Sequence, residues 1–136
     1  MTAAYLLDTN IVTAVLKRDP HVLEQLRAKL RANCRVLISA VVYYEIKRGL
    51  LKRDAMHQLA HFEEMARHWT WLNVERSHWE AAAIQWAMSK KVGAAINDAD
   101  LLLAVQARLS QAILVSNDGD FDYLDVERED WTALAT

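Results

Sequence analysis

The sequence predicts an α/β domain in which a short, mainly parallel sheet is covered by helices on both faces. Short apolar runs that suit buried strands alternate along the chain with longer segments whose apolar residues recur at helical spacing. With 136 residues, 53% of them hydrophobic, three Gly and one Pro, the chain has material for one core and little for linkers. We therefore expect a single domain over residues 1–136, with four to five strands.

Five runs are expected to form the strands, because each is apolar or alternating and is bounded by polar or turn-forming residues. They are residues 4–7, 35–38, 69–74, 112–115 and, at one edge of the sheet, 123–126. Strands that are joined through helices pair in parallel, and such sheets bind ligands beyond the carboxyl ends of their strands. A functional site is therefore expected at that edge.

Six segments have helical apolar spacing or helix-capping signals. The first covers residues 11–18, and the second starts at Asp19-Pro20 and is expected to bury Val22, Leu23, Leu26 and Leu30. The third runs from a Ser39 cap to about residue 51 with a break near Gly49, and the fourth runs from an Asp54 cap to about residue 68. The fifth is opened by a Ser77–Glu80 capping box and stopped by Gly93, and the sixth is capped by Asn97 or Asp98 and is expected to bury Leu101, Leu102, Val105 and Leu109.

Four acidic residues lie where the predicted chain passes between strand and helix. Asp8 directly follows the first strand, and Asp118 lies in a turn after the fourth. Glu45 lies about two turns into the helix after the second strand, and Asp100 starts the helix that leads into the fourth. One sheet edge is therefore expected to collect all four. Carboxylates repel one another, so such a cluster indicates a site for a hard divalent cation such as Mg²⁺.

Each of these acids also has a structural alternative. The alternatives are a helix cap for Asp8, a turn for Asn10, an ion pair with Arg48 for Glu45, a helix cap for one of Asp98 and Asp100, and a role in the Gly119 turn for one of Asp118 and Asp120. Asp98 and Asp120 are in turn lesser candidates for the metal role. The metal site is favoured because the alternatives require four coincidences on one edge.

The net charge of −2 conceals an uneven distribution. Residues 1–67 hold eleven Lys or Arg against seven Asp or Glu, whereas residues 68–136 hold five against eleven. A basic region beside an acidic pocket suits a phosphodiester substrate. The residues expected to hold an RNA backbone are Lys47, Arg48, Lys52 and Arg53. The alternative is that these are solvated helix faces.

The chain shows no pattern of secretion or membrane insertion. No signal peptide and no run of membrane-spanning length is visible, and the single cysteine, Cys34, has no internal partner. We therefore expect a cytoplasmic protein without membrane contact. His57 and His61 have the spacing of a metal pair but lack an H-E-x-x-H motif, which favours a surface role.

Four stretches together resemble the PIN-domain nucleases, and among them the VapC toxins of bacterial and archaeal toxin–antitoxin pairs. They are residues 6–11 (LLDTNI), 44–49 (YEIKRG), 97–104 (NDADLLLA) and 115–121 (VSNDGDF). Their order, their spacing and the total length agree over essentially the whole chain. One departure is Leu103-Ala104-Val105, where Ile-Ala-Ala is more usual, and it changes helix packing rather than chemistry.

The resemblance implies a Mg²⁺- or Mn²⁺-dependent endoribonuclease with a three-layer α/β/α fold. The residues it implies are the catalytic acids Asp8, Glu45, Asp100 and Asp118, with Asp8 and Asp100 as the main metal ligands and Thr9, Asn10 and Asn117 as supporting polar groups. It also implies an RNA substrate, a homodimer, and a cognate antitoxin that packs on apolar helix surface, with Trp69 and Trp71 as candidates.

Two other classes are weighed against this one. A receiver-like regulator also gathers carboxylates around Mg²⁺, but it needs a phosphoacceptor Asp after a middle strand and a Lys after a late one, and neither is in place. A catalytically silent PIN-like module is disfavoured because the four acids are intact. A D-x-D phosphatase is disfavoured because position 10 is Asn.

Overall fold

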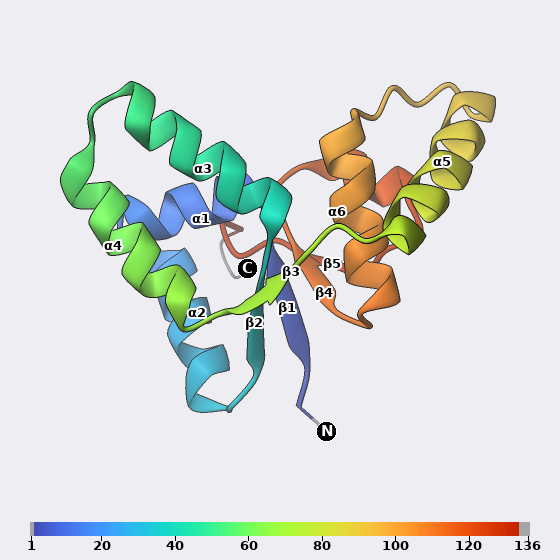
Figure 1. The fold of residues 1–136 in the computed structure, drawn as a ribbon. Coiled ribbons are helices and arrows are strands. Elements are labelled where there is room, and N and C mark those ends of the chain that lie inside the picture. The colour runs from blue at the N-terminus through green and yellow to red at the C-terminus, as the bar shows by residue number, and fades with distance from the viewer. Residues whose placement is uncertain (1, 134–136) are drawn as a thin grey trace.

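The computed structural model describes residues 2–133. Its strands are β1 (Ala4–Leu7), β2 (Arg35–Ser39), β3 (Thr70–Leu72), β4 (Ile113–Val115) and β5 (Arg128–Glu129). Its helices are α1 (Thr9–Leu16), α2 (Pro20–Arg31), α3 (Ala40–Lys52), α4 (Met56–Arg67), α5 (Arg76–Lys91), α6 (Asp98–Leu109) and the 3-10 helix η1 (Gly119–Tyr123). All strand pairs are parallel, in the order β3-β2-β1-β4-β5. Figure 1 shows α1–α4 on one face of the sheet and α5, α6 and η1 on the other, which confirms the three-layer α/β/α arrangement.

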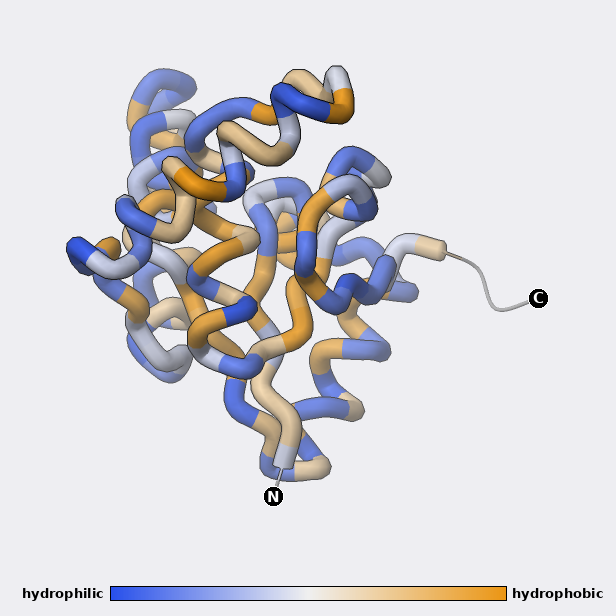
Figure 2. The backbone as a smooth tube through the Cα atoms, turned by 90° about the vertical axis from the view of Figure 1, so that its right-hand side faces the viewer, coloured by the Kyte–Doolittle hydropathy of each residue, from blue (hydrophilic) through white to orange (hydrophobic). Residues whose placement is uncertain are grey.

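The central strand β1 lies at the middle of the core. Its four residues are buried, and Leu6 lies opposite Leu37 of β2 and Leu114 of β4. Figure 2 shows the same division, with apolar stretches through the interior and hydrophilic stretches mainly outside. The chain adds β2 and β3 on one side of β1 and then β4 and β5 on the other, so the strand order reverses between β1 and β4. Ligand sites of open α/β sheets lie at such a reversal.

Four of the five predicted strands are confirmed, and the fifth is wrong. Tyr123 ends η1, Leu124 is its C-cap, and the edge strand is the two-residue β5 farther along the chain. Phe121 and Leu124 are buried, so the apolar residues of this segment pack a 3-10 turn against the core. An apolar run this short does not by itself distinguish a packed turn from a strand.

Two predicted helix boundaries between β2 and β3 are also wrong. Gly49 does not break α3, because Ile46 and Leu50 continue a buried apolar stripe past it. Asp54 does not cap α4; it adopts a φ of 53° in the turn, and Ala55 is the N-cap without a side-chain hydrogen bond. Asp is one of the residues that tolerate this left-handed conformation.

The capping of α5 differs from the predicted Ser77–Glu80 box. The ring nitrogen Nδ1 of His78 accepts a hydrogen bond from the Glu75 N–H at 2.8 Å, and Glu80 contacts Arg76 at 3.1 Å instead. Buried His78 therefore takes the role that the sequence pattern assigned to an exposed Glu. The predicted stop at Gly93 is confirmed, since its φ is 76° directly after the C-cap.

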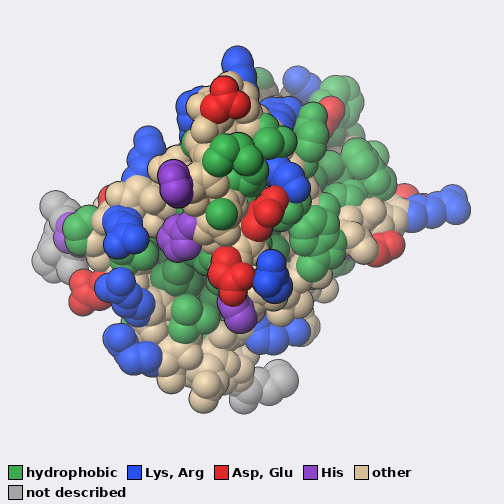
Figure 3. All heavy atoms as spheres, turned by 60° about the vertical axis from the view of Figure 1, so that its left-hand side comes forward, with side chains coloured by type: hydrophobic (Ala, Val, Ile, Leu, Met, Phe, Trp, Pro, Cys, Tyr) green, Lys and Arg blue, Asp and Glu red, His purple; other side chains and the backbone are tan. Residues whose placement is uncertain are grey.

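Several large apolar side chains are exposed. Leu30 and Leu109, which were predicted to be buried, lie in the last turns of their helices and are each about half exposed. Helix α5 buries the polar side chains of His78, Gln85 and Ser89. It exposes the large apolar side chains of Trp79, Ile84, Trp86 and Met88. Figure 3 shows hydrophobic side chains among Lys, Arg and His on the side of the molecule that carries α1–α4. No helix within residues 2–133 is long and apolar enough to cross a bilayer.

The fully buried side chain of Gln106 ties α6 to the carboxyl ends of two strands. The Ser39 hydroxyl donates to Gln106 Oε1 at 2.6 Å, and Gln106 Nε2 donates to the Asn73 carbonyl at 3.1 Å. Ser39 also caps α3, as predicted. The two helices that carry Glu45 and Asp100 are therefore held in a fixed relation to each other.

Candidate active site

Asp8 is the most enclosed of the four acids, with 8% of its surface exposed. Its backbone N–H donates to the Val115 carbonyl at 2.9 Å, which extends the β1–β4 pairing by one bond. Its Oδ1 accepts from the Thr9 N–H and its Oδ2 from the Ser116 hydroxyl, each at 2.7 Å. Burial raises the pKa of Asp8, and the charge of Asp118 adds to this, whereas the two hydrogen bonds oppose it. Asp8 is thus a helix cap, and each of its oxygens keeps a lone pair for a cation.

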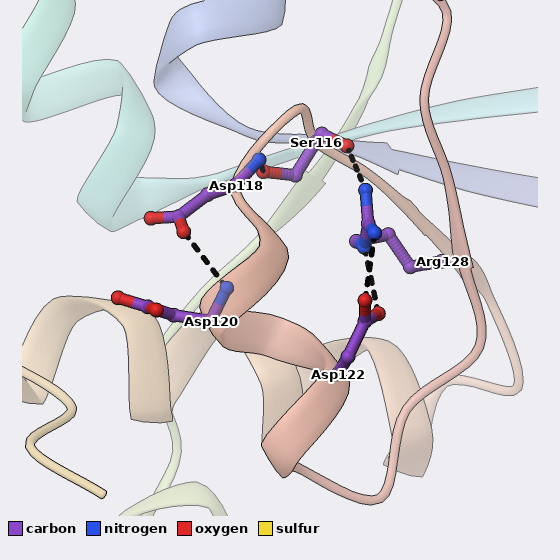
Figure 4. A network of polar contacts seen from close by, with 5 residues as sticks. All are labelled: Ser116, Asp118, Asp120, Asp122 and Arg128. Carbon is purple, nitrogen blue, oxygen red and sulfur yellow. Dashed lines mark hydrogen bonds and ion pairs between the residues drawn. The ribbon is translucent and has the colours of Figure 1, made fainter.

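Ser116 connects Asp8 to Asp118. Its hydroxyl oxygen accepts from the Asp118 N–H at 3.0 Å, and its carbonyl accepts from Arg128 of β5 at 2.9 Å. Arg128 also forms two hydrogen bonds with Asp122, each at 2.9 Å. Figure 4 shows this network, in which Arg128 holds the backbone of the segment that carries Asp118. No role was predicted for Ser116, and its position directly after a strand was the single signal of this positioning role.

Asp100 lies in the first turn of α6, next to the cap residue Asn97. Asn97 Oδ1 accepts from the Asp100 N–H at 2.8 Å, and Asn97 Nδ2 donates to Asp100 Oδ2 at 3.1 Å. Asn97 rather than Asp98 is therefore the cap. Burial raises the pKa of Asp100 to about 6, and the charges of Asp8, Asp118 and Glu45 add to this shift. The four predicted acids thus converge closely enough for their charges to interact.

No cation of residues 2–133 neutralises these acids by a salt bridge. The predicted alternative pair of Glu45 with Arg48 is wrong, because the Arg48 guanidinium lies 4.8 Å from the ring centroid of Tyr44. Glu45 Oε1 instead accepts a hydrogen bond from the Thr9 hydroxyl at 3.4 Å. The cluster is therefore electrostatically uncompensated.

The supporting polar residues Asn10 and Asn117 contact each other across the sheet edge. Asn10 Nδ2 donates to Asn117 Oδ1 at 3.4 Å, and both side chains are exposed. Together with Thr9 they border the cluster on the side of β1 and β4. The predicted polar groups are therefore in place around Asp8 and Asp118.

Within residues 2–133, no three His, Cys, Asp or Glu side chains are arranged to hold a single metal ion. The four acids lie within electrostatic range of one another without reaching a common coordination geometry. Like charges at such a range repel one another, and a cation among them would offset that repulsion. The donor set still suits a hard ion such as Mg²⁺, because all four side chains offer carboxylate oxygens and carry uncompensated charge.

The two additional acids lie to the side of the cluster. Asp120 is exposed, and its N–H donates to Asp118 Oδ1 at 2.9 Å. Asp98 is exposed and lines a separate groove between α5 and α6. Neither is among the charges that raise the pKa of Asp100. The electrostatic coupling therefore distinguishes the quartet from these neighbours.

A groove of about 510 Å³ leads away from Glu45 between α1 and α3. Of the four cations predicted to hold RNA, Arg53 is the one that lines this groove. Lys17, which was not predicted, also lines it. The remaining predicted cations lie outside its lining: Lys47, Arg48 and Lys52. Lys47 is paired with Glu63 at 3.0 Å. The α3 residues that line the groove are Glu45, Ile46, Gly49, Leu50 and Arg53.

Asp100→Asn is expected to raise the free energy of unfolding at pH 8 by about 1–2 kcal/mol, after allowance for solvent screening. The pKa of Asp100 is about 6 in the folded protein against an ordinary 3.8, so its ionised form costs stability above pH 6. The cost disappears as the pH falls toward 4, where variant and wild type should converge. Urea unfolding at several pH values measures this, with exposed Asp98→Asn as the control. A difference that does not change with pH would contradict the coupling.

Comparison with known proteins identifies relatives of this chain. The family model of the PIN domain matches residues 5–127. Ribonuclease VapC1 of Haemophilus influenzae (strain R2866) is 27% identical over 131 residues, which cover 94% of this chain and 98% of that protein.

Solved structures share the fold over nearly the whole chain. VapBC2 from Rickettsia felis, bound to a DNA fragment from its promoter, has a TM-score of 0.85 at 22% identity and covers 94% of this chain and 98% of its own. VapBC-1 from nontypeable Haemophilus influenzae has a TM-score of 0.83 at 24% identity, with 96% and 99% covered. The family match covers most of the chain and includes all four acids, and this chain therefore belongs to the PIN-domain family.

Proposed function

We propose that this chain is a metal-dependent endoribonuclease and the toxin of a VapBC-type toxin–antitoxin pair. The observation that carries the proposal is the uncompensated acidic cluster, in which the pKa of Asp100 is raised to about 6. Such a cluster at the head of a groove with cations suits the hydrolysis of a phosphodiester. RNA as the substrate, and the role of a toxin, rest on the likeness to ribonuclease VapC1 and to the VapBC structures.

Asp8 and Asp100 would hold Mg²⁺ or Mn²⁺, with Glu45 and Asp118 as further ligands. Their oxygens are the hard donors that such ions prefer. A bound ion supplies Lewis acidity toward a phosphate oxygen and lowers the pKa of a water molecule.

The side chains around these acids orient them. The Thr9 N–H and the Ser116 hydroxyl each fix one oxygen of Asp8, and Asn97 fixes one oxygen of Asp100. In the reaction, a water molecule attacks the phosphorus, the bond to the 3′-oxygen breaks, and that oxygen leaves with a proton as a hydroxyl. Orientation of this kind lets a small number of charges act on the developing transition state without further rearrangement.

An antitoxin would pack on the side of the molecule that carries α1, α2 and α4. A groove of about 300 Å³ lies there, lined by apolar side chains that include Leu26, Leu30 and Trp69, with Arg27 and His61 beside them. Figure 3 shows hydrophobic surface of this kind on that side of the molecule. Trp69 is itself buried and forms part of the lining. This apolar lining suits a partner helix with apolar and acidic side chains.

A homodimer would use the exposed apolar face of α5. Trp79, Ile84, Trp86 and Met88 are between 47% and 64% exposed on this one helix. A face of this kind on an otherwise well-packed domain favours burial against a second copy.

Asp8→Asn and Asp100→Asn are each expected to lower the rate of RNA cleavage at least about a hundredfold, because each removes charge from the metal site. EDTA should abolish cleavage by the wild type, and Mg²⁺ or Mn²⁺ should restore it. The assay is gel analysis of total RNA and of single-stranded oligoribonucleotides, with circular dichroism to verify folding. Asp125→Asn, an exposed acid away from the cluster, is the control. Cleavage that persists in EDTA, or full activity in either variant, would contradict the proposal that cleavage depends on a metal ion held by these acids.

Leu30→Glu is expected to weaken the complex with the antitoxin at least about tenfold, since it places a charge in an apolar groove. The test is co-expression with the product of the adjacent reading frame, followed by co-purification and calorimetry. Exposed Leu109→Glu, on α6, is the matched control. Unchanged affinity in Leu30→Glu would place the antitoxin elsewhere.

Trp86→Glu is expected to convert a dimer of this chain to a monomer, which light scattering after size exclusion measures directly. Trp71→Glu is the matched control, because Trp71 and Trp86 are both 47% exposed and Trp71 lies away from α5. A wild-type chain that is monomeric at high concentration would refute the homodimer. A dimer that both variants leave intact would refute the α5 interface.

A further inference from the structure

The groove beside the acidic cluster is built from two parallel stripes of side chains. Helix α1 contributes Thr9, Thr13 and Lys17, and helix α3 contributes Glu45, Gly49 and Arg53. In each stripe the residues are four apart, which places them on one face of the helix. Lys17 and Arg53 are the C-cap residues of α1 and α3, so each stripe ends in a cation at the C-terminus of its helix.

The groove has polar or charged side chains at both ends, and its lining also includes Leu16, Ile46 and Leu50. At one end the Thr9 hydroxyl donates to Glu45 at 3.4 Å, beside the acidic cluster. At the other end stand Lys17 and Arg53, eight residues farther along their helices, or about 12 Å at 1.5 Å per residue. Neither cation forms a salt bridge with an acid of residues 2–133. Their separation from Glu45 leaves both cations available to an anion in the groove.

Gly49 keeps the floor of the groove low. A Cβ atom placed on Gly49 would lie 3.9 Å from Nη1 of Arg53, so the guanidinium lies beside this glycine. Glycine is a poor residue for the middle of a helix, yet α3 continues through it. A side chain at position 49 would occupy the space between the acidic end and the cationic end.

We propose that this groove holds the sugar-phosphate backbone of single-stranded RNA beside the bond to be cleaved, with Lys17 and Arg53 binding a neighbouring phosphate of the same strand. The inference rests on the proposed function, because it takes the acidic end as the site of cleavage. Two cations at one end and the cluster at the other fix the strand along the groove. Gly49 leaves room for the backbone between them.

The competing explanation is that Lys17 and Arg53 serve only to complement the negative ends of two helix dipoles. The matched control is therefore a pair of cations that lie at the C-terminal ends of two other helices, outside the groove. Arg31 lies in the last turn of α2 and Lys91 in the last turn of α5, and both are exposed. Helix α2 ends at Arg31 and leads into the amino end of β2 (Figure 1), whereas Asp8 and Asp118 follow the carboxyl ends of β1 and β4.

The double variant Lys17→Gln/Arg53→Gln is compared with Arg31→Gln/Lys91→Gln and with wild type. Binding of a labelled single-stranded oligoribonucleotide is followed by fluorescence anisotropy in EDTA over a range of salt concentrations. The groove variant should bind at least about tenfold more weakly. The slope of its log affinity against log salt should fall by about 1.4, as expected for the loss of phosphate contacts by two cations on a single strand. The control variant should keep the wild-type slope.

Gly49→Ala tests the same groove without a change of charge. The added methyl group should favour the α3 helix and so leave the fold intact, while it weakens RNA binding several-fold. Equal slopes in the groove and control variants, or a wild type that does not bind single-stranded RNA, would overturn the inference. A wild type that binds RNA with the predicted slope but cleaves none in Mg²⁺ would instead refute the proposed function alone.

Discussion

Repulsion among four carboxylates at one sheet edge is the constraint on which the rest of this structure depends. Parallel pairing of β1 with β4 brings Asp8 beside the segment of Asp118, and the Gln106 hydrogen bonds hold α3 and α6, which carry Glu45 and Asp100. No Lys or Arg of residues 2–133 is paired with these acids. The fold therefore holds charges together at a cost to its own stability, which a bound cation or a proton relieves.

Charge separation extends from this cluster into the groove between α1 and α3. Cations that stood beside the acids would neutralise them, so a nuclease of this design keeps its phosphate-binding cations at a distance. Lys17 and Arg53 are placed about two helical turns away by the pitch of their own helices. Lys47, by contrast, is paired with Glu63 and packs over Tyr43, and it stabilises the contact of α3 with α4. Position along a helix thus decides which cations are available.

Much of the fold could be predicted from sequence, because buried parallel strands leave clear apolar runs. Residues 4–7 form β1 as expected, and Asp8 follows it as the cap of α1 and a member of the acidic cluster. The misassignments arose where tertiary packing overrides a local signal: α3 passes through Gly49 because Leu50 is buried, and His78 caps α5 because it is enclosed. Arg53 was predicted as a cation that holds RNA, whereas Ser116 and Lys17 could not be found, since their partners lie on other elements.

The central claim is that the four acids form one coupled cluster that a divalent cation completes. Carboxyl NMR of Asp100 across pH tests it most directly, in wild type and in Asp8→Asn, with and without Mg²⁺. The account predicts a pKa near 6 in the cation-free wild type, a lower pKa in Asp8→Asn, and a marked fall on addition of Mg²⁺ to wild type. An Asp100 carboxyl that titrates at its ordinary value and ignores both changes would contradict the account.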